Sequence, residues 1–162
     1  AVSRSVIGTS HQQQQIPCQD YGSSRVLDRL VVGAIADGAG SATHADIGAK
    51  LAVTAMLEYL TATETWLQEH HNSWQELPHT PTEDLVRKLF VKAVSKVTTV
   101  LQTQAERSHY DVNNLACTLL TFLATPDWIA AMQIGDGFMI VRSPESDYQL
   151  VFQPVKGEFA NQ

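Results

Sequence analysis

An apolar run from Leu30 to Ala36 stops abruptly at Asp37-Gly38. A continuous apolar run of this length predicts a buried strand that is covered on both faces. An ionised carboxylate at the end of such a strand is costly unless a cation meets it. Glycines at that point let the backbone bend and bring its carbonyl groups close to a ligand. The pattern therefore predicts a metal-binding corner at Asp37 and Gly38.

After this corner the spacing of apolar residues becomes helical. Thr43, with an acidic residue three positions later, resembles a capping box and predicts a helix that ends near Thr61. The apolar stripe of this helix consists of Ile47, Leu51, Ala55 and Tyr59, flanked by Ala52, Met56 and Leu60. A second start signal, Thr80-Pro81-Thr82-Glu83, precedes a stripe that continues to Leu101. We expect residues 62–79 to connect two antiparallel helices on one face of a sheet.

The remaining segments predict strands and turns. Ser3–Ser10 is expected to be a short strand, and His11–Gln19 a polar loop. Arg25–Arg29 begins the strand at residue 30 or pairs with it. Four later strands, in an antiparallel meander, are expected at residues 115–124, 128–134, 138–142 and 148–152. This order of strands, helices and strands predicts the α+β class.

Composition narrows the range of partners and compartments. The 162 residues are enough for a single domain with its own core. A net charge of -6 without a Lys/Arg cluster argues against nucleic acid or an anionic membrane as a partner. Cys18 and Cys117 form neither a disulfide framework nor a zinc motif, which favours reduced thiols in the cytoplasm. We expect neither a membrane span nor a signal peptide.

Carboxylates stand beside glycines at four places, which are Asp20-Tyr21-Gly22, Asp37-Gly38-Ala39-Gly40, Asp136-Gly137 and Gly157-Glu158. The simpler explanation of each is a turn, and for Asp136 that explanation is favoured. It is weaker for Asp37, because the strand there continues into a helix and needs no hairpin. Hard cations such as Mg²⁺ and Mn²⁺ prefer oxygen ligands and keep several waters, so two or three carboxylates suffice.

The other reactive side chains are less informative. His11 precedes Asp20 in the loop, and the alternative for it is an ordinary surface imidazole. Ser41 lacks the surroundings of a nucleophile elbow, and Cys117 is expected in the core. The glycines after Asp37 match neither a phosphate-binding loop nor a dinucleotide fingerprint.

Taken in order, several segments resemble the metal-dependent protein phosphatase family (type 2C), in its shorter bacterial branch. The matching segments are Gly8-Thr9-Ser10-His11, Cys18-Gln19-Asp20, Val32–Gly40, Ala116–Leu120, Gln133–Gly137 and Pro154–Asn161. Each segment alone is weakly specific, whereas their order and spacing cover nearly the whole chain. The resemblance implies a β-sandwich flanked by antiparallel helix pairs.

The resemblance also implies a centre of two Mn²⁺ or Mg²⁺ ions. Asp20 would bind one ion, Asp37 would bridge both, and the Gly38 carbonyl would add a ligand. Asp136 corresponds to a residue associated with an additional, weaker metal. The implied activity is hydrolysis of phosphoserine or phosphothreonine in phosphorylated proteins, a signalling reaction, by metal-activated water.

Two departures from the family pattern qualify this expectation. The arginine that holds the phosphate in many members is replaced by Gln12–Gln15, which leaves His11 as a substitute. The later metal carboxylates of the family have no counterpart, so residues 1–162 look like the N-terminal part of one domain. We therefore expect weak binding of the second metal and little or no activity. The alternatives are a non-catalytic phosphatase-like module that binds phosphoproteins, and an unrelated α+β binding domain.

Overall fold

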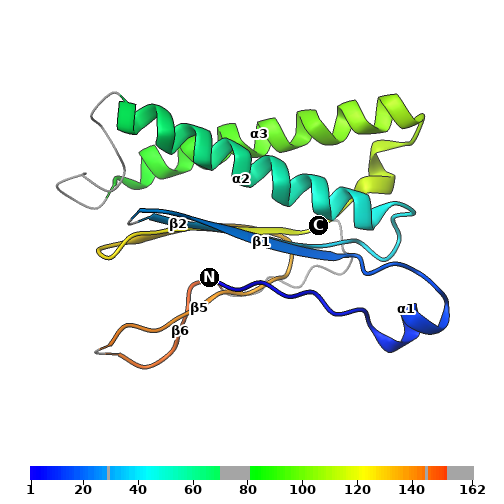
Figure 1. Ribbon diagram of the computed structural model, residues 1–162, viewed down its shortest axis with the longest axis horizontal. Helices are drawn as coiled ribbons and strands as arrows, with labels where there is room; N and C mark the ends of the chain where they lie inside the picture. The colour runs from blue at the N-terminus through cyan, green and yellow to red at the C-terminus, as the bar shows by residue number, and fades with distance from the viewer. Residues whose placement is uncertain (29, 70–80, 145, 153–162) are drawn as a thin grey trace.

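The computed structural model describes residues 1–28, 30–69, 81–144 and 146–152. Figure 1 shows two long helices on one face of a four-stranded sheet, with the N-terminal segment and a two-stranded sheet on the other side. The α+β prediction is confirmed, and the two sheets are the layers of the expected sandwich. The Gly157-Glu158 pair, the Pro154–Asn161 segment and Thr80 lie outside the described residues.

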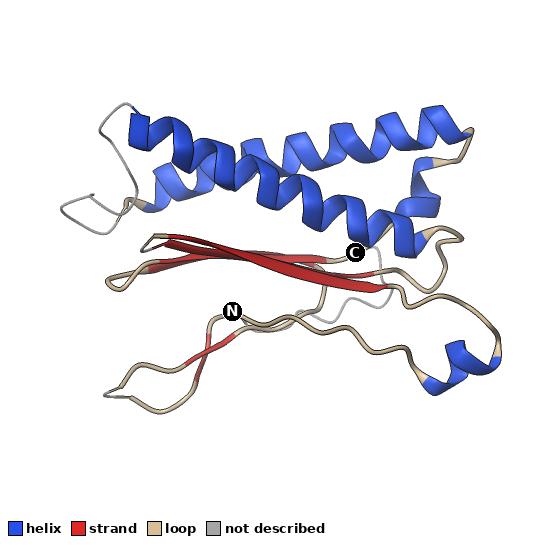
Figure 2. Cartoon of the chain, viewed as in Figure 1, coloured by secondary structure: helices blue, strands red, loops and turns tan. Residues whose placement is uncertain are grey.

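The four-stranded sheet is antiparallel throughout, and its strands lie in the order β1-β2-β3-β4. Its strands are β1 (Asp20–Leu27), β2 (Leu30–Asp37), β3 (Leu119–Ala124) and β4 (Ile129–Ile134). The second sheet pairs β5 (Ile140–Val141) with β6 (Gln149–Leu150). The helices are α1 (Thr9–Gln13), α2 (Ala45–Glu69), α3 (Glu83–Ser108) and the 3-10 helix η1 (Val112–Leu115). Figure 2 shows that α2, α3 and η1 form the connection from β2 to β3.

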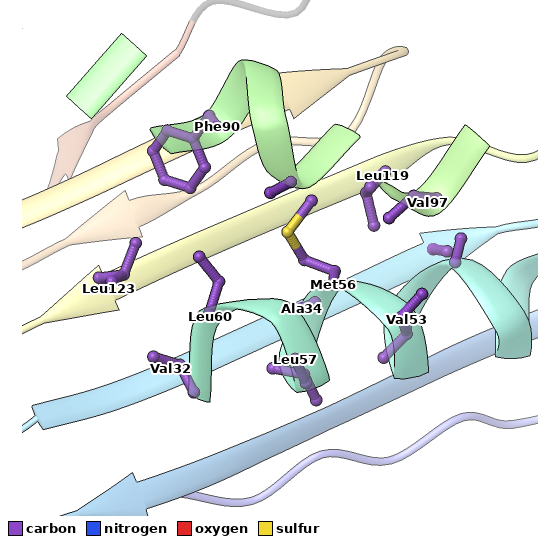
Figure 3. Packing of buried hydrophobic residues seen from close by; sticks show 14 of the residues in the cluster. Val32, Ala34, Val53, Met56, Leu57, Leu60, Phe90, Val97, Leu119 and Leu123 are labelled. Atoms are coloured by element: carbon purple, nitrogen blue, oxygen red, sulfur yellow. The ribbon is translucent and has the colours of Figure 1, made fainter. Parts of the chain in front are cut away.

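The core lies between the four-stranded sheet and the helix pair (Figure 3). Alternate residues of β2 point toward the helices and are at most 4% exposed, namely Leu30, Val32, Ala34 and Ala36. They pack with Met56 and Leu60 of α2, Phe90 of α3 and Leu123 of β3. This face of the sheet agrees with the predicted burial of the apolar run.

The opposite face of the sheet is covered only in part. Ile35, which points away from the helices, is 50% exposed, so the prediction of cover on both faces is wrong at this position. The N-terminal segment and the two-stranded sheet leave a groove of about 370 Å³ between the layers, lined by residues that include Gly33, Ile35 and Phe122. Asp37 lies on this same face, since side chains alternate along a strand.

Several local predictions need correction. Ser3–Ser10 is not a strand: Ser3 donates its hydroxyl proton to the Gly22 carbonyl (2.9 Å), but the segment joins no ladder. Helix α1 spans the end of this segment and the start of the predicted polar loop, and none of its residues is fully buried. Arg25 belongs to β1, which settles the open alternative in favour of a hairpin partner for β2.

The helices also differ in extent and in their caps. Helix α2 begins at Ala45 rather than at Thr43, whose hydroxyl donates instead to Asn114 Oδ1 (3.5 Å). It continues to Glu69, well beyond the predicted end. Four residues of the predicted stripe are buried, namely Ala52, Ala55, Met56 and Leu60, whereas Ile47, Leu51 and Tyr59 are only partly buried. The buried face is wider than predicted and adds Ala49, Val53 and Leu57, because α2 packs on both the sheet and α3. Thr82, not Thr80, caps α3 by accepting from the Leu85 N–H group.

No helix in the described part of the chain has an apolar stretch long enough to cross a bilayer.

We expect Gly48→Ala to destabilise the protein, although alanine is normally preferred in a helix. A Cβ atom at Gly48 would overlap the backbone carbonyl of Leu115 in η1. Relief of this overlap requires α2 and η1 to separate, at a cost of about 2 kcal/mol. Denaturant unfolding measures the change. Gly40→Ala is the matched control, because nothing lies within 4 Å of a Cβ atom there. Equal stability of the two variants would contradict the described packing.

Candidate metal centre

Asp20 and Asp37 face each other directly across the β1–β2 pair. The Gly38 N–H group donates to the Gln19 carbonyl (3.1 Å), so the adjacent Gln19–Gly38 pair is a hydrogen-bonded one. Because hydrogen-bonded and non-hydrogen-bonded pairs alternate, Asp20 and Asp37 form the closer kind, with Cα atoms about 4.5 Å apart. Both carboxyl groups therefore lie side by side on the outer face of the sheet.

The backbone of Asp37 is held from the other side by Thr118, which directly precedes β3. The Asp37 N–H group donates to Thr118 Oγ1 (2.9 Å), and the Thr118 N–H group donates to the Asp37 carbonyl (2.8 Å). The end of β2 is thus hydrogen-bonded on one side to the residue before β1 and on the other side to the residue before β3.

Gly38 is required for close packing rather than for a special backbone angle. A Cβ atom there would lie 2.6 Å from the Ala45 Cβ atom at the start of α2 and 3.0 Å from the Gln19 Cβ atom. Among the described residues, no backbone N–H group donates to the Gly38 carbonyl. This oxygen remains available to a ligand.

The pKa of Asp37 is raised from 3.8 to about 6. Burial is the main cause, followed by a hydrogen bond with the Asp20 carboxyl group and by the charges of Asp20 and Asp136. His11 on α1 partly opposes the shift by attraction. The fold therefore brings Asp20, Asp136 and His11 close enough to Asp37 for their charges to affect its pKa.

Asp136 lies in the turn that follows β4, where the chain leaves for the second sheet. Gly135 has φ +95°, a conformation that favours glycine. The Gln133 side-chain amide donates to the carbonyls of Gly135 (2.8 Å) and Gly137 (2.7 Å), on either side of Asp136. A turn is thus present, as the simpler explanation expects, and it carries Asp136 into the cleft that Asp20 and Asp37 also line.

This cleft has a volume of about 510 Å³ and lies between the sheet and the N-terminal segment. Two polar residues that line it, Arg4 and Thr118, were not predicted as site residues from the sequence. Arg4 stands in a segment predicted as a strand, and no local pattern connects it to Asp20. Thr118 belongs to one of the family-like segments, but only the pairing of strands far apart in the sequence reveals its contact with Asp37.

The donor atoms suit a hard divalent cation. Asp20 and Asp37 present carboxylate oxygens, and Gly38 adds a carbonyl oxygen. Burial and, to a smaller extent, the neighbouring Asp20 charge both make the ionised form of Asp37 unfavourable, and a bound cation would offset both effects. Within the described residues, no group of three or more His, Cys, Asp and Glu side chains could hold a metal ion. Waters would therefore supply the remaining ligands, as is common for Mg²⁺.

Comparison with known proteins gives two matches. Residues 7–162 match the family described as protein phosphatase 2C. The chain is also 31% identical, over 168 residues, to serine/threonine-protein phosphatase 3 of Escherichia coli (strain K12). That alignment covers 99% of this chain but 59% of the relative, so the chain spans about three fifths of the length of this curated relative.

We expect Asp20→Asn to lower the pKa of Asp37 from about 6 toward its ordinary value. The substitution removes the charge of Asp20, whereas the burial of Asp37 persists, so the decrease is partial. A titration of the Asp37 carboxyl carbon by NMR measures it. Asp127→Asn, in an exposed turn, is the control and leaves the pKa unchanged. An unaltered Asp37 titration in Asp20→Asn would show that the two carboxyl groups do not interact.

Proposed function

The chain belongs to the protein phosphatase 2C family, and on this basis we propose that it forms part of a metal-dependent protein serine/threonine phosphatase. The observation that carries the proposal is the direct pairing of Asp20 with Asp37 at the rim of one cleft. Two carboxylates that meet in a concave site, and that form no salt bridge with any other described residue, are suited to divalent metal ions.

We assign Asp20, Asp37 and the Gly38 carbonyl to two Mn²⁺ or Mg²⁺ ions, and Asp136 to a further, weaker ion. Bound ions of this kind supply an activated water and neutralise charge on a phosphoryl group. The role of the chain is to hold these oxygens on a rigid strand end, where Thr118 and the β1–β2 ladder restrain Asp37. His11, whose charge acts on Asp37, is proposed as a contact for the substrate phosphate.

The proposed substrates are proteins phosphorylated on serine or threonine. The name of the Escherichia coli relative supports this class of substrate. We expect low activity from the 162-residue chain, because the described residues offer few anionic ligands to hold the second ion. Both cysteines are free thiols, which supports a cytoplasmic protein.

A non-catalytic module that binds phosphoproteins is the second candidate. The observation that favours it is the lack, within the described residues, of any three-ligand group for a metal ion. Metal binding separates the two functions, because the enzyme requires it and the module does not.

We expect hydrolysis of p-nitrophenyl phosphate to be slow, to require Mn²⁺ and to be lost in Asp37→Asn. The substitution removes the carboxylate that is placed to bridge two ions. Release of p-nitrophenol with and without Mn²⁺ measures the activity, and Asp127→Asn is the control. Turnover that persists in Asp37→Asn or without added metal would contradict the proposed site.

We expect the affinity for Mn²⁺ to decrease by about tenfold per pH unit below pH 6, since a proton then occupies Asp37 and must be displaced. Above the pKa of about 6 this carboxyl group is ionised, and the affinity no longer depends on its protonation. Calorimetric titration with Mn²⁺, repeated at steps of about one pH unit from roughly pH 5 to pH 8, measures this dependence. The absence of Mn²⁺ binding at every pH would favour the non-catalytic module.

A further inference from the structure

Thr118 contacts both acidic segments of the cleft. Its hydroxyl oxygen and its backbone N–H group form the two hydrogen bonds that hold the N–H and carbonyl groups of Asp37. These residues are 81 positions apart in the sequence, and the bonds join the end of β2 to the start of β3. Thr118 itself supplies no charge and also lines the cleft.

The methyl group of Thr118 faces the turn that carries Asp136. A Cβ atom at Gly135 would lie 2.6 Å from Thr118 Cγ2 and 2.9 Å from Thr118 Cβ, so this position has no room for a side chain. The φ angle of +95° imposes the same restriction independently. The backbone of Gly135 therefore rests directly on Thr118.

The turn is rigid beyond this contact, because one side chain braces it from within. Gln133 donates to the carbonyls of Gly135 and Gly137, which flank Asp136. A displacement of Gly135 thus moves the backbone of Asp136 as well. Through Thr118 the position of Asp136 is tied to that of Asp37.

We propose that Thr118 is a positioning residue that fixes the Asp37 and Asp136 carboxyl groups relative to each other. Its hydroxyl oxygen determines where Asp37 lies, and its methyl group determines where the Gly135–Gly137 turn lies. The significance of this arrangement for metal binding rests on the proposed function, whereas the mechanical connection between the two segments does not.

A purely structural threonine three residues further along, within β3, provides the matched control. Thr121 is fully buried and donates its hydroxyl proton to the Gly33 carbonyl (2.8 Å). Like Thr118, it joins β3 to β2 through its hydroxyl group, but it lies inside the sheet and does not line the cleft. Its replacement by valine removes a comparable bond without touching either acidic segment.

The first experiment measures Mn²⁺ affinity by calorimetry at pH 7. Thr118→Val keeps the shape of the side chain but removes the acceptor for Asp37, and we expect affinity to fall about tenfold or more. Thr118→Ser retains the acceptor for Asp37 but loses the methyl group that contacts Gly135, and we expect it to lose less affinity than Thr118→Val. Thr121→Val is expected to stay within about threefold of the unsubstituted protein, even if it lowers the melting temperature. Unchanged affinity in Thr118→Val, or an equal loss in Thr121→Val, would overturn the proposal.

The second experiment requires no metal. We expect Gly135→Ala to displace Thr118 and so to move the ¹⁵N–¹H amide resonance of Asp37. Gly137→Ala is its control, since a Cβ atom there would meet Leu120 at an ordinary 3.8 Å, and it should leave that resonance in place. An unmoved Asp37 resonance in Gly135→Ala would disprove the connection, whether or not Mn²⁺ binds.

The two readouts separate the inference from the proposed function. If the unsubstituted protein binds no Mn²⁺, the proposed function fails, and the amide resonances alone decide the role of Thr118. If Thr118→Val does not fold, the comparison of Gly135→Ala with Gly137→Ala decides it.

Discussion

The antiparallel register of β1 and β2 is the constraint on which the candidate site depends. It places two like-charged carboxyl groups, Asp20 and Asp37, directly opposite each other. Such a pair destabilises a sheet unless a proton or a cation intervenes. The chain accepts this cost at a strand end, where Thr118 and Gly38 leave Asp37 little freedom to turn away. A local loss of stability of this kind is characteristic of sites built to bind a ligand.

The packing of the helices explains why the site lies where it does. Helices α2 and α3 cover one face of the four-stranded sheet and enclose the core, so the acidic residues must occupy the other face (Figure 1). On that face the N-terminal segment and the turn that carries Asp136 form the walls of an open cleft. One face of the sheet thus provides stability, and the other provides the chemistry. Two consecutive residues of β2 show this difference, because Ala34 is buried under the helices and Ile35 on the other face is half-exposed.

The sequence predicts those features that depend on local pattern. The end of β2 at Asp37, the helix pair and the existence of the later strands follow from periodicity and from the residues that interrupt it. The predicted single meander is wrong, because β3 and β4 join the first sheet whereas β5 and β6 form a second one. The role of Thr118 could not be predicted from sequence, because it arises from a strand pairing across a long separation in sequence. Arg4 and α1 were missed for a different reason: short polar segments have weak intrinsic preferences, and contacts with the sheet decide their course. The roles of Asp20, Asp136 and His11 came from a family resemblance, since their local surroundings are those of ordinary turns and loops.

The insertion of both long helices between two neighbouring strands separates the assembly of the site into an early and a late stage. The β1–β2 hairpin closes over a short span, with Leu27 paired to Leu30, so the two facing carboxyl groups meet through local contacts. The hydrogen bonds of Thr118 require closure of a loop of about eighty residues. Its entropic cost is larger than that of the hairpin, so these bonds are expected to form more slowly. We therefore expect the acidic pair to form before Thr118 restrains it, so that a divalent cation present at that stage would encounter a looser site than the native one.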